Sequence, residues 1–408
     1  MIGAGVAGAS TAMQLAWRGC SVIVLERDML GSGSTGRAAG LLGQLRSTRA
    51  ATKMLMDGVQ IVRELEQRTG TEIFVQTGSL RVAADESRAV EVRDHVAMGK
   101  SIDFPIELID REQVAQMLPY MKTDDLVAAC YCPTDGHLQP GELLAAYVHL
   151  ARQAGAEFCT QSPVDEVLVD AGRAKGVRTG DAEYHAPVIV NSTGPWSADL
   201  AQRSTTRLPT AAIGHYYLTT LPLPDVNVDR HSPAIRDRGL RIYSRPEAGG
   251  LIVGMYGADP PLYDMQALGV DFDMSQMQVG RADVNVATLI DAAGRRFPFI
   301  DGRTPMNITT GIMTFTPDGK PFCGRLPDID GLYHCAGFCG HGIVQSPAIG
   351  KIMAELIVDG ATTYDIAEIE ADRMYEMAEL TDRAAVRRLC AEMAGNYYGA
   401  IASTDTAE

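Results

Sequence analysis

The chain begins with residues 1–8, MIGAGVAG, which contain the spacing G-x-G-x-x-G. Residues 9–19 follow as a helix-length segment with apolar residues at helical spacing and a glycine at its end. An apolar run rich in β-branched residues then leads to Glu26. This order of glycine turn, helix, strand and acid is typical of a dinucleotide-binding βαβ unit. The stretch therefore predicts an α/β fold built on such a unit.

Each glycine of the motif has its own physical role. Gly3 permits a tight turn, Gly5 lets the backbone approach a pyrophosphate, and Gly8 allows the helix to pack closely on a strand. The helix N-terminus offers free N–H groups and a partial positive charge to the same pyrophosphate. Glu26 lies where its carboxylate can accept hydrogen bonds from both ribose hydroxyls. An acid there disfavours a 2′-phosphate, so NADP is the least favoured ligand, whereas NAD and FAD remain open.

The first strand of the unit is unusually short in this sequence. Only Met1 and Ile2 precede the first glycine, whereas strands average about five to six residues. Either the printed chain begins late or the strand is shortened, and the sequence leaves both interpretations open.

Composition narrows the class of protein. The chain has 408 residues, of which 46% are hydrophobic and 21% charged, so we expect two or three globular domains. A net charge of −15 disfavours nucleic acid and anionic membranes as partners. The eight cysteines lack paired C-x-x-C spacing, which predicts reduced thiols and no metal site. No apolar run reaches the roughly 18 residues of a membrane span, and no leader precedes the motif, so we expect a cytoplasmic protein.

Residues 31–49, GSGSTGRAAGLLGQLRSTR, extend the cofactor-binding pattern beyond Glu26. By composition alone this glycine- and serine-rich stretch would be a flexible surface loop. Its position directly after the acid-bearing strand favours a close-fitting polar segment instead. Residues 26–40 resemble the D-amino acid oxidase superfamily of FAD enzymes. More narrowly, they resemble its sarcosine and dimethylglycine dehydrogenase branch, whose members read close to G-S-x-T-W-H-A-A-G-L here.

Further segments match that branch in the same order along residues 3–365. They are residues 131–140, 188–197, 315–319 and 331–343. The resemblance implies FAD rather than NAD. It also implies an α/β fold in which a Rossmann-like FAD-binding domain of the glutathione-reductase type is interleaved with a substrate domain built on a mixed antiparallel sheet.

The resemblance also implies domain boundaries. The FAD-binding domain is expected to comprise residues 1–76, 139–205 and 306–365, and the substrate domain residues 77–138 and 206–305. Residues 366–408 read as a charged helical extension. Strands are expected at 78–83, 215–220, 241–245 and 250–256. A folate-binding domain often follows in the branch, and since the chain stops at residue 408, we expect that domain to be absent.

The motif and the resemblance together assign the cofactor residues. They are Gly3, Gly5, Gly8, Glu26, Arg27, Ser34, Thr35, Arg37, Ala39, Gly40, Val164, Gly194, Trp196, Gly337, Gly340, His341, Gly342 and Ile343. The branch carries a flavin-linked histidine where this chain has Arg37. Sarcosine oxidases use a cysteine where this chain has Gly311. We therefore predict that FAD is bound non-covalently.

Candidate catalytic residues follow from the resemblance as well. The branch places a histidine and a tyrosine near the substrate amine, and the matching residues here are His215 and Tyr243, followed by Tyr217. Strand alternation places Arg241, Tyr243 and Arg245 on one face.

An anionic substrate needs a local cation in so acidic a protein, and arginine suits a carboxylate. Arg46 and Arg49 resemble the G-x-x-R-x-x-R of sarcosine oxidases. With Arg245, they are the predicted substrate-binding residues.

The expected reaction is the FAD-dependent oxidation of a secondary or tertiary amine by hydride transfer to flavin N5. An N-methylated amino acid such as sarcosine or dimethylglycine would be demethylated. Two alternatives stay open. One is oxidation of proline, hydroxyproline or a D-amino acid, and the other is a non-catalytic flavin-binding subunit of a larger complex. The sequence does not assign the electron acceptor, which could be oxygen or an electron-transfer protein.

Overall fold

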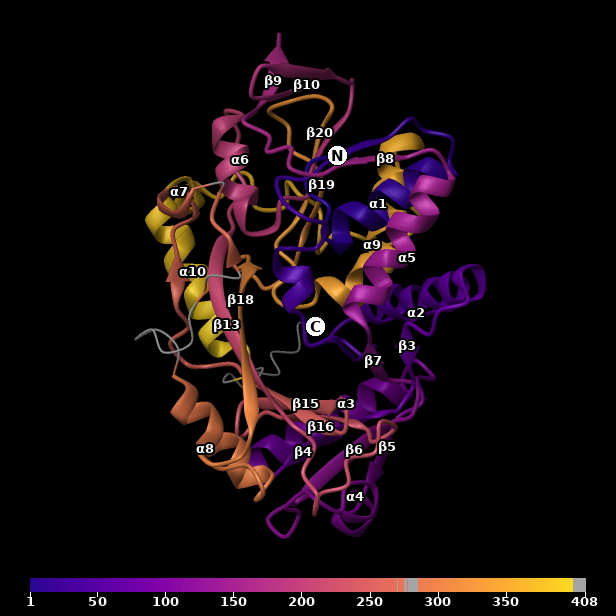
Figure 1. Ribbon diagram of the computed structural model, residues 1–408, viewed down its shortest axis with the longest axis vertical. Coiled ribbons are helices and arrows are strands. Elements are labelled where there is room, and N and C mark those ends of the chain that lie inside the picture. The colour runs from indigo at the N-terminus through magenta and orange to yellow at the C-terminus, as the bar shows by residue number, and fades with distance from the viewer. Residues whose placement is uncertain (270, 275–276, 278–284, 399–408) are drawn as a thin grey trace.

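The computed structural model describes residues 1–269, 271–274, 277 and 285–398 (Figure 1). A mostly parallel sheet with helices against it forms one part, and a large mixed sheet forms the other. In Figure 1 the parallel part lies around the labels α1, α5 and α9, and the large sheet runs from the labels β13 and β18 through β15 and β16 to β4, β6 and β5.

The parallel sheet is centred on the first residues of the chain. Its strands are β8 (Glu157–Cys159), β1 (Ile23–Leu25), β12 (Ile189–Asn191), β20 (Leu332–Ala336) and the antiparallel β19 (Phe322–Arg325). Ile2 forms parallel bridges to Leu25 and to Asn191, and so joins β1 to β12. In the printed chain, one residue before the glycine turn therefore connects the two strands.

Helices pack closely against one another beside this sheet. Helix α1 (Val6–Trp17) contacts both α5 (Pro140–Gln153) and α9 (Gly342–Val358), and α9 also contacts α2 (Arg49–Thr69). A Cβ atom at Gly350 would lie 2.1 Å from Ser10 Oγ, so glycine is needed where α9 meets α1. This packing fixes the starts of α1 and α9 relative to each other.

Within the described residues, the large sheet contains nine strands. They run in the order β18, β13, β16, β15, β14, β4, β6, β5, with β17 also paired to β13. Their bounds are β4 (Ser79–Ala83), β5 (Glu107–Ile109), β6 (Ala128–Cys132), β13 (Ala211–Thr220), β14 (Ala234–Asp237), β15 (Ile242–Glu247), β16 (Gly250–Met255), β17 (Leu262–Tyr263) and β18 (Met306–Phe315). One face buries apolar residues with α4 (Arg111–Met117) and α8 (Val286–Arg296). The other face carries the polar side chains described below.

Smaller elements complete the described chain. Two three-stranded sheets comprise β9 (Glu166–Asp170), β10 (Arg173–Thr179) and β11 (Ala182–His185), and β2 (Leu41–Leu42), β3 (Phe74–Val75) and β7 (Gly136–Leu138). The remaining helices include α3 (Glu86–Lys100), α6 (Ser197–Arg203), α7 (Met265–Leu268) and α10 (Arg383–Asn396). Within the described ranges, no helix has both the length and the apolarity needed to cross a bilayer.

Two sequence expectations differ from the structure. The segment 306–315 was expected in the FAD-binding part, but β18 pairs with β13 from Met306–Thr220 to Phe315–Ala211, so it belongs to the large sheet. Arg241 was expected in a strand beside Tyr243. Its φ of 59° takes it out of the strand, and its Nε donates instead to the Tyr256 carbonyl at 2.7 Å.

The C-terminal region is partly described. Helix α10 packs against β13 and β18. Of the expected extension, residues 399–408 lie outside the described part of the chain, as do residues 270, 275–276 and 278–284 of the expected substrate domain.

Candidate active site

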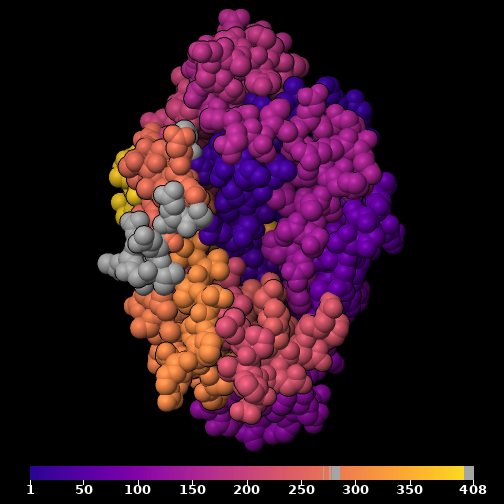
Figure 2. Space-filling view, in the orientation of Figure 1, coloured from indigo at the N-terminus to yellow at the C-terminus, as the bar shows by residue number. Residues whose placement is uncertain are grey.

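A long cavity lies between the parallel part and the large sheet. It is lined by the starts of α1 and α9, the loop at 31–41, residues 192–196 and residues of β13, β14, β15 and β18. On the face shown in Figure 2, the indigo N-terminal segment lies between the magenta and orange parts of the chain, and the surface is hollowed there.

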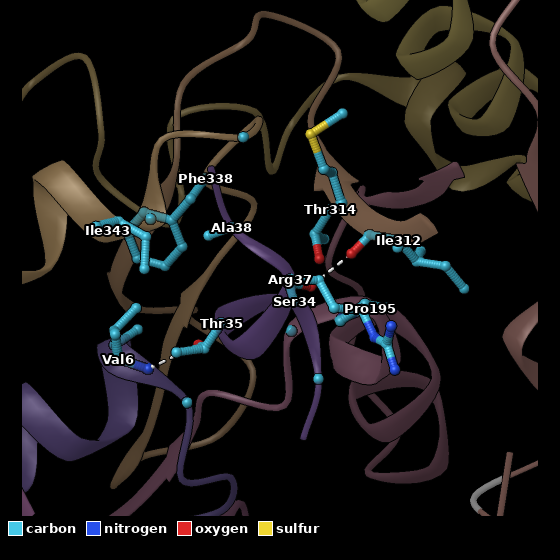
Figure 3. A pocket seen from close by; sticks show the side chains of 18 of the residues that line it. Val6, Ser34, Thr35, Arg37, Ala38, Pro195, Ile312, Thr314, Phe338 and Ile343 are labelled. Carbon is cyan, nitrogen blue, oxygen red and sulfur yellow. Dashed lines mark hydrogen bonds between the residues drawn. The ribbon is translucent and has the colours of Figure 1, made fainter. Parts of the chain in front are cut away.

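The glycine motif forms one wall of this cavity. Gly3 has a φ of 95°, and a Cβ atom on it would lie 2.6 Å from the Ser192 carbonyl oxygen. A Cβ atom at Gly8 would lie 2.1 Å from the Gly3 carbonyl oxygen, so Gly8 keeps the turn compact although it does not line the cavity. Gly5 does line the cavity. There the Val6 N–H donates to Thr35 Oγ1 at 3.1 Å (Figure 3).

Glu26 is held rigidly beside the motif. Its carboxylate is 8% exposed and accepts hydrogen bonds from the N–H groups of Ala4, at 2.7 Å, and Asp28, at 3.0 Å. Each carboxylate oxygen has a further lone pair for a hydroxyl donor. The carboxylate is therefore oriented before any ligand binds.

Arg27 and Trp196 form an adjacent part of the lining. The Arg27 guanidinium lies 3.7 Å from the centre of the Trp196 ring, and its Nη2 donates to the Phe272 carbonyl at 2.9 Å. Burial lowers the pKa of Arg27. Val164 and Gly194 line the same cavity, so these four predicted cofactor residues share its wall.

The loop at 34–37 faces β18 across the cavity. Ser34 Oγ donates to the Ile312 carbonyl at 2.5 Å, as Figure 3 shows, and Arg37 Nη1 donates to the Thr310 carbonyl at 3.2 Å. A Cβ atom at Gly311 would lie 3.2 Å from Cβ and Cδ of Arg37. The two positions that the resemblance assigns to flavin attachment, Arg37 and Gly311, therefore lie side by side, and neither holds a histidine or cysteine. Arg37 Nε is buried with no hydrogen-bond partner among the described residues.

The start of α9 also opens into the cavity. Gly337, Gly340, Gly342 and Ile343 line it, as do Ala39 and Gly40 of the loop opposite. Free N–H groups at a helix start favour negative charge. His341 Nδ1 lies 2.8 Å from Tyr397 Oη and 3.1 Å from the Cys339 carbonyl oxygen. Burial, with the charges of nearby arginines, lowers the pKa of His341 well below its ordinary value, so the ring is neutral at pH 7.

His215 and Tyr243 meet in the same cavity. His215 Nε2 lies 2.7 Å from Tyr243 Oη. Burial lowers the pKa of His215 to about 4 and raises the pKa of Tyr243 well above its usual value. Tyr217 lines the cavity two residues beyond His215 on the same strand face. The structure thus brings together the three predicted catalytic side chains, with His215 and Tyr243 both uncharged at neutral pH.

Strand register explains this convergence. Arg236, Tyr243, Gly254, Tyr217 and Thr309 pair in register across five neighbouring strands. In-register residues on adjacent strands point to the same face. A Cβ atom at Gly254 would lie 2.1 Å from the Tyr243 ring, so glycine makes room for the ring to lie across the sheet.

Several residues that line the cavity were not predicted from the sequence. Arg236, Tyr256 and Tyr398 all line the cavity. The Tyr256 ring centre lies 5.0 Å from that of His215 and 4.7 Å from that of Tyr398. Tyr256 ends the expected strand 250–256, and a tyrosine at that position was a usable signal. No comparable signal marked Arg236, because its strand has four residues.

The predicted substrate-binding arginines occupy three different environments. Arg49 begins α2, and its Nη2 donates to the Ser101 carbonyl at 3.1 Å on the surface. Arg245 is buried, donates to the Ala39 carbonyl and pairs with Glu247, so it supports the loop at 38–40 from behind. Neither lines the cavity. Arg46 does not line the cavity either. Burial, and after it the charges of the nearby Arg236 and Arg81, lowers the pKa of Arg46 to about 10.

Comparison with known proteins identifies the class. The family model for FAD dependent oxidoreductases (DAO) matches residues 1–356, and the chain belongs to this family. FAD is therefore its cofactor. Human sarcosine dehydrogenase is 29% identical over 391 residues, which cover 94% of this chain and 42% of that protein. The mouse pyruvate dehydrogenase phosphatase regulatory subunit is 28% identical, covering 91% and 42% respectively. The chain thus spans less than half the length of these relatives.

A solved structure gives the same fold. L-proline dehydrogenase from P. horikoshii superposes with a TM-score of 0.81 at 24% identity, covering 92% of this chain and 96% of that one. The predicted fold class, with a Rossmann-like FAD-binding part and a mixed sheet, is confirmed.

The residues present fit FAD. Gly5 has no Cβ atom to block a pyrophosphate, two helix N-termini open into one cavity, and the fixed Glu26 carboxylate can take ribose hydroxyls. Arg37 Nε, buried without a partner, is a donor available to a bound group.

Among the described residues, no cluster of three or more His, Cys, Asp or Glu side chains could hold a metal ion, and all eight cysteines are free thiols.

Two buried histidines outside the reacting pair predict a pH effect on stability. Burial lowers the pKa of His137 to about 3 and that of His334 to about 4, from an ordinary 6.5. The unfolded chain then binds more protons than the folded one between about pH 6.5 and 4. We therefore expect the free energy of unfolding to fall as pH falls through this window and to be regained above 6.5, by about 2 kcal/mol per histidine between pH 7 and 5.

Urea unfolding at pH 5, 6 and 7 measures this dependence, with a His334→Gln variant for comparison. In the variant, the free energy of unfolding should change less between pH 7 and pH 5, by about the contribution of one histidine. The same pH dependence in the variant and the wild type would contradict a lowered pKa for His334.

Proposed function

We propose that this protein oxidises a secondary or tertiary amine that carries a carboxylate, in the class of N-methylated amino acids such as sarcosine or dimethylglycine. The observation that carries the proposal is the hydrogen-bonded pair of His215 and Tyr243 in the FAD cavity. The resemblance to human sarcosine dehydrogenase along 94% of this chain supports the same class of substrate.

The pair suits the proton chemistry of amine oxidation. Bound FAD supplies the acceptor for the hydride equivalent. The substrate amine must lose its ammonium proton before it can react. Tyr243 keeps its own proton at neutral pH, and the hydroxyl can donate it to neutral His215 Nε2. The oxygen of Tyr243 then has lone pairs left to accept the ammonium proton, which can pass along this hydrogen bond to His215.

The aromatic walls complete the site. Tyr217, Tyr256 and Tyr398 line the cavity together with the pair, and the Tyr256 ring centre lies 5.0 Å from that of His215. Burial raises the pKa of Tyr256 well above its usual value, so its hydroxyl stays protonated and available as a donor. A neutral amine is favoured in such surroundings over an ammonium ion.

Anaerobic mixing of the holoenzyme with sarcosine, dimethylglycine, proline and D-alanine tests the proposal. Bleaching of the flavin absorbance by an N-methylated amino acid is the expected result. Faster bleaching by proline or D-alanine would favour those substrates instead.

A non-catalytic flavin-binding subunit is the second candidate, because one relative is named as a regulatory subunit. In that case no amine would bleach the flavin, although dithionite would still reduce it.

We further propose that FAD is held without a covalent bond. Arg37 and Gly311 stand at the two attachment positions and cannot form the bond. Acid precipitation should therefore leave the yellow flavin in the supernatant. Colour that stays with the precipitated protein would contradict this.

A further inference from the structure

Three arginines lie together beside the catalytic pair. Arg81 of β4 and Arg236 of β14 pair in parallel register, and Arg236 pairs in turn with Tyr243 of β15. Arg236 lines the cavity, whereas Arg46 and Arg81 are not among its lining residues. Its Nη1 and Nη2 atoms lie 3.0 Å from where a Cβ atom of Gly43 would stand, so its guanidinium reaches the segment that carries Arg46. Arg46 is close enough for its charge to act on both other arginines.

These arginines lack acidic partners within the described part of the chain. Arg46 Nη1 donates only to the neighbouring Leu45 carbonyl, at 3.3 Å, and its Nη2 is buried without a hydrogen bond. Arg81 and Arg236 make no side-chain hydrogen bond or ion pair with described residues. Elsewhere the acidic chain pairs its buried arginines, as Arg296 pairs with Asp237 at 2.8 Å. Like charges held this close repel one another, so the cluster favours an anion.

The groups around the cluster do not neutralise it. Asp135 is its nearby acid, and that carboxylate already accepts from Ser79 Oγ at 2.6 Å and from the Gln44 N–H at 3.0 Å. His95 and His341 face the cluster as neutral rings, because burial and the arginines lower the pKa of His95 to about 2 and that of His341 well below 6.5. Burial raises the pKa of Tyr397, which lies near the cluster, so its hydroxyl is uncharged at neutral pH. Three positive charges and one negative charge give the cluster a net charge of +2, which two anionic groups would balance.

We propose that Arg46, Arg81 and Arg236 form a subsite for two carboxylates of one substrate. This rests on the proposed amine oxidation and narrows it to amines with two carboxylates, such as N-methylaspartate, N-methylglutamate or iminodiacetate. Neighbouring strands lie about 4.8 Å apart, so Arg236 is one strand from Tyr243 and Arg81 two strands away. One carboxylate binds Arg236 next to the amine, and the second binds between Arg81 and Arg46, at the reach of a short dicarboxylate.

Titration with unreactive acids separates binding from turnover. Glutarate and butanoate are added to the holoenzyme at equal ionic strength, and the flavin absorbance is followed. We expect glutarate to bind at least tenfold more tightly than butanoate. Arg81→Gln should remove that preference while leaving the FAD spectrum and the butanoate affinity unchanged. Arg93→Gln, which removes an exposed charge paired with Glu86 on α3, is the matched control and should keep the preference.

The outcomes distinguish this subsite from the proposed function. Equal affinities for glutarate and butanoate in the wild type, or an unchanged preference in Arg81→Gln, would overturn the subsite. Arg46→Gln provides the same comparison if Arg81→Gln does not fold. Flavin bleaching by sarcosine as fast as by N-methylaspartate would refute the subsite and leave amine oxidation standing. Tight glutarate binding without bleaching by any amine would refute amine oxidation and retain the subsite.

Discussion

Replacing His215 with asparagine is expected to slow flavin reduction by the amine substrate about 10²- to 10⁴-fold, the usual range for losing a positioned acid or base. Asparagine can still hydrogen-bond to Tyr243, but it cannot accept a proton. The hydrogen bond at 2.7 Å connects His215 to the residue that we place next to the ammonium group. FAD content should stay unchanged, because no hydrogen bond of His215 within the described chain reaches the glycine motif or Glu26.

Tyr243→Phe should slow the same step, because it removes the oxygen through which the proton passes. Tyr216→Phe is the matched control: Tyr216 is on the same strand as His215, but its hydroxyl donates to the Asn285 carbonyl at 3.1 Å, outside the cavity. Stopped-flow absorbance under anaerobic conditions measures all three variants. Reduction rates equal to that of the wild type in His215→Asn and Tyr243→Phe would remove both residues from the mechanism.

The FAD part of the fold was predictable because its determinants are local. Gly3, Gly5 and Gly8 specify a turn and a helix start within eight residues, and Glu26 follows after one helix and one strand. Such a unit has few alternative structures, since each glycine serves a backbone geometry that other residues resist. Segment 306–315 shows where prediction from local patterns fails. It is followed by family motifs of the FAD part, yet its backbone pairs with β13 along ten residues.

The substrate end of the site depends on contacts between distant strands. Alternation correctly places Tyr243 and Arg245 on one face, but alternation does not reveal which partner a long side chain reaches. Arg245 reaches the Ala39 carbonyl, about two hundred positions earlier in the chain. Arg81 and Arg236 become neighbours only when β4 and β14 pair in parallel. That pairing joins segments more than 150 residues apart, for which the sequence carries no local signal.

Replacing Gly5 with alanine is expected to weaken FAD binding at least about 100-fold, or about 3 kcal/mol, while the protein still folds. Gly5 has φ −74° and ψ 179°, which alanine adopts without strain. Its new Cβ atom would lie 3.1 Å from Thr35 Oγ1, a contact that a small shift of the side chain relieves. The same atom would occupy the space through which the pyrophosphate approaches the start of α1.

Two other glycines make this test specific. Gly8→Ala should unfold the protein, because its Cβ atom would lie 2.1 Å from the backbone oxygen of Gly3. Gly141→Ala should change neither FAD binding nor folding, because no atom lies within 4 Å of its Cβ position. Fluorescence titration of the apoprotein with FAD and far-UV circular dichroism measure binding and folding separately. Wild-type FAD affinity in Gly5→Ala would mean that the pyrophosphate does not pass over Gly5, and the cofactor would then have to bind the cavity in a different orientation.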